Sequence, residues 1–581
     1  MVTGARQLFP LELDAMRHFA GTCIWAVAAF VTLSTQPPCY AASEAQLRAG
    51  VAAVVITPFG KNPNWNGPIT SSGVWGEAYT DKNKNQHWDK GEPFTDDAGN
   101  TALDAHSKNK YDGIFLAGFG NDRLATGKHD DLWARALVLD LGKTRLAIVA
   151  LDLIGYYSHS GYYGGDEVHK LLDPSLGITD ILIASTHNHE GPDTIGLWGM
   201  NPGSDGKYPR YLQFVDRQIA KAIALAAKSL TPVRLKLGST DASTSPALVG
   251  TQTRTASRPP SFFDEEMRVM QFVGLNGAHK DKAVATLINW NTHPESMEDE
   301  NTILTSDFPG AVRDRIEQMY GGTAIYVSGD IGAVEIVGDN DGSKRTQFDG
   351  KTFPILKDNK AMFTFERMEA IGHEVAKAAI GAIEKGQWSD PANFSVKKAE
   401  LRVRLENQGY EFLMSQGVLA ALPASGNGHE AVTTIYAIRL GDAQVITAPG
   451  ELFPEAFYGD AKYRRTDCAA ADTKRPPEPA VRDFMQAKYK FVFGLTPDEL
   501  GYIVPGYDFH APAFDPAKGF TEAVDACAAS GVPTHYHETN SASSQLAPSW
   551  ACAAVTLLSG NTPDMPACQH AQPAPKAGTK P

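Results

Sequence analysis

A short apolar strand that ends in two histidines is encoded at residues 181–194, ILIASTHNHEGPDT. Ile181 to Ala184 are apolar and partly β-branched, which indicates a buried strand. His187 and His189 follow it, one residue apart, before a glycine and a proline. Neutral imidazole is the commonest ligand that proteins offer to zinc. The stretch therefore predicts a metal-binding strand end, with an ordinary polar surface loop as the alternative.

Two further strand-like runs end in residues of the same chemical kind. Residues 285–295, ATLINWNTHPE, reach His293, and residues 443–453, AQVITAPGELF, reach Glu451. Open α/β sheets build their sites just past the carboxyl ends of strands. Two histidines, a carboxylate and one open position are what catalytic zinc requires. We expect a site at these strand ends, in one large α/β (mixed α+β) catalytic domain with mixed sheets flanked by helices.

Strands and helices alternate along the rest of the chain. Residues 132–139 and 145–154 predict two strands joined by a hairpin-type turn. Residues 211–230 have helical periodicity, with one apolar face. Further helices are expected at residues 308–319 and 368–385.

Several segments match those of one known family in the same order along the chain. The family's THTHSGP segment is similar to THNHEGP of this chain. Its HxTSM segment, with the following SxDNKG, is similar to NTHPESMEDENTILTSDFPG, and its PxEF segment is similar to APGELF. The family's opening glycine-rich turn resembles GIFLAGFGNDRLATGKHDDLWARALVLD of this chain. Its SYVTT-type turn resembles TPDELGYIVP, and its EEYEAxSTxxGP segment resembles HYHETNSASSQLAP. On these segments the chain resembles the neutral (non-lysosomal, alkaline) ceramidases, which are zinc-dependent amidases that cleave the amide of N-acylsphingosine.

The resemblance implies a role for individual residues. Carried over position by position, the zinc ligands are His187, His293, Glu451 and Tyr502. His189 matches the second histidine of the family motif, which lies beside the metal and handles protons or substrate.

An arginine is implied at the reacting amide as well. Arg254, in GTQTRTA, matches an arginine that the family places near the scissile bond. A guanidinium there can stabilise an oxyanion, as can any fixed donor aimed at developing negative charge.

The chain departs from the family at a turn that carries a serine, G-(D/N)-x-S-P-N. Residues 328–334 read SGDIGAV, so Gly332 stands in the place of the serine and Ser328 lies too early to be its equivalent. Water activated by zinc is then the simpler nucleophile, because the metal lowers the pKa of water toward neutrality. Glu190 and Asp193 also replace small residues of the family motif. They predict a more acidic pocket rim that selects a different amide or ester.

Composition and the N-terminus indicate an exported protein. The net charge of −14 and the pI of about 5.6 argue against nucleic-acid binding, which needs a basic face. Residues 1–41 predict a secretory signal peptide, with basic residues, an apolar run at residues 19–33 and small residues after it. A lipoprotein acylated at Cys39 is the weaker alternative. No other stretch is long and apolar enough to cross a bilayer, so a secreted or periplasmic location is expected, with membrane-surface contact left open.

Cysteine usage fits that location. Removal of the signal leaves Cys468, Cys527, Cys552 and Cys568. An even number in an exported chain predicts disulfides, for which three connectivities exist. Proximity along the chain favours Cys468–Cys527 and Cys552–Cys568, and buried free thiols are the alternative.

A calcium loop is predicted at residues 81–92, DKNKNQHWDKGE, where oxygen-bearing residues have the spacing of an EF-hand loop. The candidate ligands are Asp81, Asn83, Asn85, His87 through its backbone carbonyl, Asp89 and Glu92. Gln86 replaces the usual glycine, so the tight turn costs more. The loop belongs to an insertion at residues 62–108 that the family pattern lacks, and a merely polar surface insertion is the alternative.

These observations predict one zinc hydrolase domain over residues 42–568 and a disordered tail over residues 569–581. Three functions remain open. The first is a secreted amidase that hydrolyses N-acylsphingosine or a related lipid with zinc-activated water. The second is a zinc hydrolase of another amide or ester on the same scaffold, and the third is a non-catalytic exported binding protein. Four retained ligand-type residues argue against the third, because unpaired buried ligands are costly. A long apolar slot beside His187 would favour the first over the second.

Overall fold

A computed structural model describes eleven parts of the chain. They are residues 46–58, 82, 93, 114–158, 163–248, 254–336, 345–354, 363–419, 429–465, 474–521 and 535–569. All of them belong to one compact unit, Ala45–Pro581. The predicted signal peptide, the six candidate calcium ligands, Cys468, Cys527 and residues 570–581 lie outside these parts, so the corresponding predictions stay predictions.

The larger sheet has nine strands in the order β11-β9-β8-β6-β1-β3-β4-β5, with β15 paired to β6. Their bounds are β1 (Arg48–Val55), β3 (Trp133–Leu141), β4 (Thr144–Leu151), β5 (Asp180–Ser185), β6 (Thr231–Asp241), β8 (Glu266–Gly274), β9 (Ala283–Trp290), β11 (Thr323–Ser328) and β15 (Gln387–Ser389). Two pairs, β4–β5 and β9–β11, are parallel. The sheet is therefore mixed, as expected, and it carries a parallel pair at each of its two ends.

This sheet folds over at a narrow point between β1 and β6. The two strands pair only through Arg48–Pro232 and Ala49–Thr231. Beyond that point, β11 lies against β3, β4 and β5 of the other half. Arg135 of β3 donates to the carbonyl of Ala324 in β11 at 3.0 Å, which ties the halves together. The fold therefore brings the two edge strands, β5 and β11, next to each other.

A second sheet packs against the first. It contains β16 (Ser395–Arg404), β17 (Glu430–Leu440), β18 (Ala443–Thr447) and β20 (Tyr489–Phe493), in that order. Apolar side chains of β3, β4, β5, β9 and β11 share one buried core with those of β17, β18 and β20. Burial of this continuous apolar surface between sheets is the main source of stability for such a domain.

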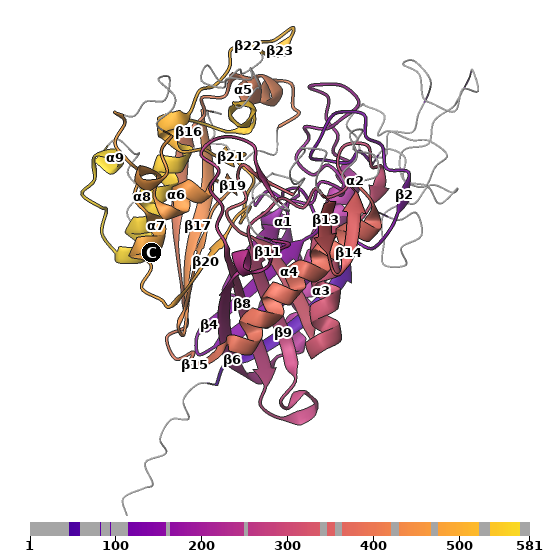
Figure 1. The fold of residues 1–581 in the computed structure, drawn as a ribbon, viewed down its shortest axis with the longest axis vertical. Coiled ribbons are helices and arrows are strands. Elements are labelled where there is room, and N and C mark those ends of the chain that lie inside the picture. The colour runs from indigo at the N-terminus through magenta and orange to yellow at the C-terminus, as the bar shows by residue number, and fades with distance from the viewer. Residues whose placement is uncertain are drawn as a thin grey trace, which may run out of the picture. The chain divides into compact units, whose positions relative to one another are not determined.

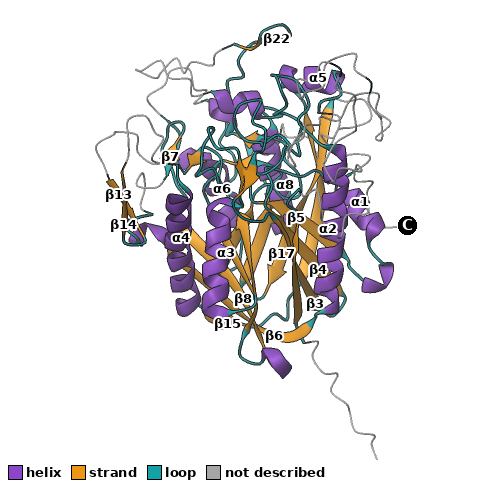
Figure 2. Cartoon of the chain, turned by 90° about the vertical axis from the view of Figure 1, so that its right-hand side faces the viewer, coloured by secondary structure: helices purple, strands orange, loops and turns teal. Residues whose placement is uncertain are grey.

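Helices cover the outer faces of both sheets (Figures 1 and 2). α2 (Pro209–Lys228) packs on the half that contains β3 to β5. α3 (Asp307–Tyr320) and α4 (Phe365–Lys385) pack on the half that contains β8, β9 and β11. α6 (Pro454–Tyr458), α7 (Val481–Phe484) and α8 (Leu546–Ser559) cover the smaller sheet. The predicted mixed sheets flanked by helices are confirmed, as are the 132–154 hairpin and the three helices, each with small differences at its ends.

Several short elements complete the structure. The paired strands are β2 (Gly127–Lys128) with β10 (Ile303–Leu304), β7 (Thr255–Ala256) with β12 (Val334–Glu335), β13 (Arg345–Phe348) with β14 (Lys351–Pro354), β19 (Glu451–Leu452) with β21 (Tyr502–Ile503), and β22 (Phe514–Asp515) with β23 (Gly519–Phe520). The short helices are α1 (Gly165–Leu171), α5 (Gln408–Ser415) and α9 (Pro566–Gln569). Of these, the β19–β21 and β7–β12 pairs matter most, because they lie beside the candidate site.

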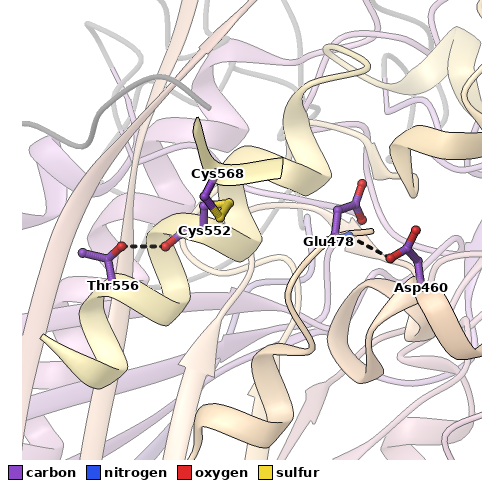
Figure 3. Close-up of a disulfide and its surroundings, with 5 residues drawn as sticks. All are labelled: Asp460, Glu478, Cys552, Thr556 and Cys568. Atoms are coloured by element: carbon purple, nitrogen blue, oxygen red, sulfur yellow. Dashed lines mark hydrogen bonds between the residues drawn. A yellow bond between two sulfur atoms is a disulfide. The ribbon is translucent and has the colours of Figure 1, made fainter. Parts of the chain in front are cut away.

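A disulfide joins α8 to α9 through Cys552 and Cys568 (Figure 3). The same view shows the backbone amide of Glu478 donating to Asp460 at 2.8 Å nearby. The disulfide confirms one of the two predicted pairs. Of the helices in the described parts of the chain, none combines the length and the apolar composition that a membrane span needs.

Candidate active site

Three predicted strand ends meet at one place. His187 follows β5 and His293 follows β9. Glu451, in β19 just after β18, pairs in register with Tyr502 of β21. The fold-over of the large sheet brings them together: Ser328, the last residue of β11, donates its Oγ hydrogen to the carbonyl of Thr186 at 2.7 Å.

The two histidines share one carboxylate oxygen. Oε2 of Glu451 lies 2.9 Å from Nε2 of His293 and 3.3 Å from Nε2 of His187. The other ring nitrogens are fixed by backbone: Nδ1 of His187 lies 2.8 Å from the carbonyl of Ile154, and Nδ1 of His293 lies 2.9 Å from that of Val334. A backbone carbonyl on Nδ1 selects the tautomer whose Nε2 lone pair is free to bind a metal.

The backbone at this point is unusual. His187 has a φ of 66°, in the left-handed region that residues with a Cβ seldom adopt. Such conformations persist where the surrounding structure holds them, and they cluster at functional sites.

Electrostatics couple these groups tightly. Burial alone would raise the pKa of Glu451, but His187 and His293 outweigh it and hold that pKa far below its usual range. Burial lowers the pKa of His293, but Glu295 and Glu451 raise it to about 10. The site therefore keeps Glu451 ionised, and this carboxylate favours positive charge on the His293 ring, supplied by a proton or by a metal ion that displaces it.

Tyr502 completes the predicted set. Its ring centre lies 6.3 Å from that of His293 and 4.7 Å from that of His537. Burial raises the pKa of the Tyr502 hydroxyl well above its usual value, and the charge of Glu451 raises it further. The structure thus brings together all four residues that the resemblance assigns to zinc.

His189 lies beside this group, with its Nδ1 3.6 Å from Oε2 of Glu295. In the described parts of the chain, one cluster of three residues is compact enough to hold a metal ion, and His189 belongs to it together with His187 and His293. The ligand atoms of the three residues lie within 4.8 Å of one another. Neither of its ring nitrogens has a hydrogen-bond partner, although His189 is only 6% exposed. Burial and the two neighbouring histidines lower its pKa well below the usual value. A neutral, unanchored imidazole is available for proton transfer.

A glycine makes room for this ring. A Cβ on Gly118, whose φ is 98°, would lie 2.3 Å from the His189 ring, so no side chain fits there. Phe119 then meets the same ring edge to face at 4.8 Å. The glycine-rich turn that follows residue 113 is thus the wall against which His189 packs.

These residues border a cavity of about 290 Å³. Its polar lining includes His187, His189, Glu295, Glu298, Glu335, Glu451, Glu499 and Asn540. Its aromatic and apolar lining includes Phe119, Ile154, Ile195, Leu197, Trp198, Tyr410, Tyr502 and Tyr536. The described lining contains no serine, threonine or cysteine, and no lysine or arginine. The cavity is at the lower end of the range of about 300–1,000 Å³ typical of small-molecule sites.

The serine turn of the family is closed to a side chain here. A Cβ on Gly332 would lie 2.6 Å from the carbonyl of Glu451 and 2.8 Å from the amide of Phe453. Ser328 is fully buried, and its hydroxyl is engaged with Thr186. Neither position offers a hydroxyl to the cavity.

Arg254 is not brought to the cavity. Its buried guanidinium forms an ion pair with Glu265 and donates to the carbonyl of Leu248 at 3.1 Å. It also lies over the rings of Phe263 and Trp290. Arg254 therefore has a structural role in this protein instead of the expected place at the scissile amide, because its charge is paired with Glu265, eleven residues along the chain.

Glu190 and Asp193 do not form the expected acidic rim either. Glu190 is buried and paired with Arg123 at 3.0 Å. Asp193 accepts hydrogen bonds from the backbone amides of Ile195 and Gly196. Both carboxylates hold loops in place.

Sequence reasoning missed the acids that do line the cavity. They are Glu295, Glu298, Glu335 and Glu499, and Tyr410 is a further polar residue of the lining. They lie on turns and short strands, where no regular spacing marks them. One of them, Glu295, stands two residues after His293, which is the one signal that the sequence offers.

Comparison with known proteins supports the resemblance. Residues 110–341 match the family model described as neutral/alkaline non-lysosomal ceramidase, N-terminal. Among curated proteins, none matches the sequence. The crystal structure of neutral ceramidase from Pseudomonas aeruginosa has a similar fold, with a TM-score of 0.52 and 16% identity over 92% of this chain and 77% of that chain. A structure described as ceramidase complexed with C2 gives a TM-score of 0.51 at the same identity and coverage.

The matched region contains His187, His189 and His293, while Glu451 and Tyr502 lie beyond it. At 16% identity, the structural comparison establishes the fold. The resemblance to the neutral/alkaline non-lysosomal ceramidases is thereby confirmed: residues 110–341 match that family's N-terminal model, in a chain whose fold is similar to that of the solved ceramidase structures.

Proposed function

We propose that this protein is an exported zinc-dependent amide hydrolase of the ceramidase type. The observation that carries the proposal is the convergence of His187 and His293 on Oε2 of Glu451, with both Nδ1 atoms fixed by backbone carbonyls. This donor set fits zinc, which takes imidazole nitrogen and carboxylate oxygen and needs partners that orient its ligands. Tyr502, paired in register with Glu451, would be the fourth ligand.

Zinc bound there would polarise the amide carbonyl and lower the pKa of a water molecule toward neutrality. The nucleophile is water, because no serine, threonine or cysteine stands in the described lining of the cavity. His189 would take a proton from the attacking water and deliver it to the leaving amine. Its free ring nitrogens and its lowered pKa suit a base that must be neutral at physiological pH.

Tyr410 takes over the role that the sequence assigned to Arg254. It lines the cavity, and burial raises the pKa of its hydroxyl well above the usual value, so that the hydroxyl keeps its proton. A fixed O–H donor can stabilise the oxyanion that forms when water adds to the carbonyl.

The proposed location rests on the disulfide between Cys552 and Cys568. Disulfides persist in oxidising compartments and are rare in the cytosol. This supports export to the periplasm or beyond.

The test combines metal analysis with hydrolysis. Purified protein should contain about one zinc per chain and should cleave N-acyl amides, including ceramides, in a reaction that chelators stop and zinc restores. His293→Ala should lose zinc and activity, while the exposed His279→Ala should keep both. A wild-type protein that binds no metal, or that binds zinc but cleaves no amide, would contradict the proposal and favour a binding protein.

A further inference from the structure

The cavity is far more acidic than a site for a neutral lipid amide requires. Four of its carboxylates belong to residues other than the proposed ligands: Glu499, and a group of three made up of Glu295 in the turn after β9, Glu298 in the same turn and Glu335 in β12. We call these three residues the acidic wall. Burial raises the pKa of Glu295 most, and the charges of Glu335 and Glu298 raise it further, against the opposing effect of His293.

Within the described structure, Glu295 of the acidic wall has a histidine partner, since Nδ1 of His189 lies 3.6 Å from its Oε2, whereas Glu298 and Glu335 form no ion pair. The guanidinium of Arg123 is paired with Glu190 at 3.0 Å and reaches Glu298 only at its backbone carbonyl. Arg367 is buried and its charge lowers the pKa of Glu298, but the two side chains form no salt bridge. Glu335 accepts a hydrogen bond from Tyr536 at 2.9 Å, and the Glu298 carboxylate makes none within the described residues. Like charges at close range disfavour ionisation, and burial with the charge of Glu335 raises the pKa of Glu298 to about 7.

A second, independent observation points to a ligand. Glu499 is 7% exposed and lines the same cavity, and its Oε2 has no hydrogen-bond partner. His189 also lines the cavity, and neither of its ring nitrogens forms a hydrogen bond, although Nδ1 lies 3.6 Å from Oε2 of Glu295. Buried polar atoms without partners are rare in native proteins, and each calls for an explanation. In its ionised form Glu499 can only accept, so a donor is the partner that suits its Oε2.

The chemistry of the missing group follows from these observations. An aliphatic ammonium has three donors and no acceptor, and it carries the charge that the wall lacks. Trp198, Tyr536 and Phe119 supply ring faces in the same lining, and aromatic faces attract ammonium groups. The hydroxyls of a neutral lipid could donate hydrogen bonds, but they would leave the charge of the wall uncompensated.

A second metal ion fits less well. A divalent cation needs several ligand atoms at one point. In the described parts of the chain, His187, His189 and His293 are the one group of three metal-ligating residues that is compact enough. The carboxylates of the wall do not form such a group. Separate hydrogen bonds from one ammonium can span carboxylates that a single ion cannot.

We infer that the substrate of this hydrolase carries an aliphatic ammonium group close to the scissile amide, as in an N-acylated diamine, and that Glu298, Glu335 and Glu499 hold that group. The inference rests on the proposed function and narrows its substrate class. The sequence left open the hydrolysis of a different amide on the same scaffold. The inference specifies which class of amide that would be.

The experiment compares two amides that differ only in charge. N-octanoyl-1,4-diaminobutane and N-octanoyl-pentylamine have the same shape, because a methyl group replaces the ammonium. With the zinc-loaded protein, kcat/KM should favour the ammonium compound on the order of 10²-fold, as expected when a buried site must pair its polar groups. Glu298→Gln and Glu335→Gln should each lower that ratio severalfold, and the exposed Glu384→Gln should leave it unchanged.

Binding gives a readout that does not need turnover. Calorimetry on metal-free protein should show tighter binding of the ammonium compound, and Glu335→Gln should remove the difference. Equal kcat/KM values, or a preference for the neutral compound or for ceramide, would overturn the inference while leaving the proposed hydrolase intact. A second equivalent of bound divalent cation that is lost in Glu298→Gln would also overturn it. Absence of hydrolysis with a preserved binding preference would instead count against the proposed function alone.

Discussion

Nε2 of His293 lies 2.9 Å from Oε2 of Glu451, although 158 residues separate them in the chain. The contact joins the end of a strand in the large sheet to a residue that follows a strand in the small sheet. Neither sheet alone can form the site. The metal-binding geometry therefore depends on the shared apolar core that fixes one sheet against the other.

His293→Ala should empty the metal site. The substitution removes one imidazole and also the partner that keeps Glu451 ionised, so the remaining donors bind zinc weakly. Zinc per chain, measured by mass spectrometry, should fall to near zero and amide hydrolysis with it. His279→Ala, an exposed histidine after β8, is the matched control. Full zinc occupancy in His293→Ala would disprove the ligand assignment.

The sequence predicted the fold class and the meeting of His187, His293 and Glu451, because each follows an apolar strand whose pattern is readable locally. Tyr502 needed the resemblance, since a lone tyrosine in a turn has no distinguishing spacing. The positions of the Arg254 and Glu190 side chains could not be predicted from the sequence. Each is determined by an ion pair with a residue on another segment, Arg254 with Glu265 and Glu190 with Arg123.

The acidic residues that line the cavity could not be predicted from the sequence for a related reason. Glu298 and Glu335 lie on a turn and on a two-residue strand, where neither helical nor strand periodicity indicates which way a side chain points. Glu499 reaches the cavity only because β21 pairs with β19. Tertiary pairing of short irregular segments, and not local propensity, determines this part of the site.

Ser328→Ala should be mild and His189→Ala severe. The Ser328 hydroxyl only bonds the carbonyl of Thr186, so its loss should cost about 1 kcal/mol of stability and leave most of the activity. His189 is the proposed base, and its loss should lower kcat by roughly 10²–10⁴-fold with zinc retained. The check is kcat for protein of measured zinc content. An inactive, zinc-loaded Ser328→Ala, or a trapped acyl group on Ser328, would refute the use of water as nucleophile.

Gly332→Ser should not restore a serine mechanism. Its Cβ would lie within 2.8 Å of backbone atoms of Glu451 and Phe453, so β19 must shift and carry Glu451 with it. Zinc affinity should fall roughly tenfold or more, as when the support of a metal ligand is disturbed. Gly381→Ser, at a glycine of α4 with open space around it, controls for the substitution itself. Higher activity in Gly332→Ser would show that the turn still accepts the family's serine.

Tyr410→Phe and Arg254→Met should separate a role in the cavity from a role in the core. Loss of the Tyr410 hydroxyl should lower kcat by about 10²-fold, as for one oxyanion donor, with the melting temperature little changed. Arg254→Met leaves the Leu248 carbonyl without its donor and should cost about 1–3 kcal/mol of stability. Its kcat per bound zinc should stay near that of the wild type. A large fall in kcat for Arg254→Met at normal stability would show that Arg254 takes part in the reaction.

Asp216 of α2 should make stability fall as the pH rises. Its Oδ1 accepts hydrogen bonds from the Tyr156 hydroxyl and from the Gly164 amide at 3.2 Å. Burial raises its pKa from the ordinary value of 3.8 to about 7, against the opposing effect of those bonds. Between these values the folded protein holds a proton that the unfolded chain has released, so the free energy of unfolding decreases by about 1.4 kcal/mol for each pH unit at most. Below pH 3.8 the carboxyl is neutral in both states, and above pH 7 the full cost of the buried charge is present.

Asp216→Asn isolates this effect. The amide oxygen can still accept both hydrogen bonds, but it cannot ionise. The stability of the variant relative to the wild type should therefore rise between about pH 4 and pH 7 and level off above that range. Urea unfolding at pH 4.5, 6.0 and 8.0 measures the difference, and Asp166→Asn, an exposed acid on α1, reports what removal of a surface charge does. A difference between Asp216→Asn and the wild type that stays constant with pH would mean that Asp216 ionises equally easily in both states, so that Tyr156 and Gly164 stabilise its charge enough to offset burial.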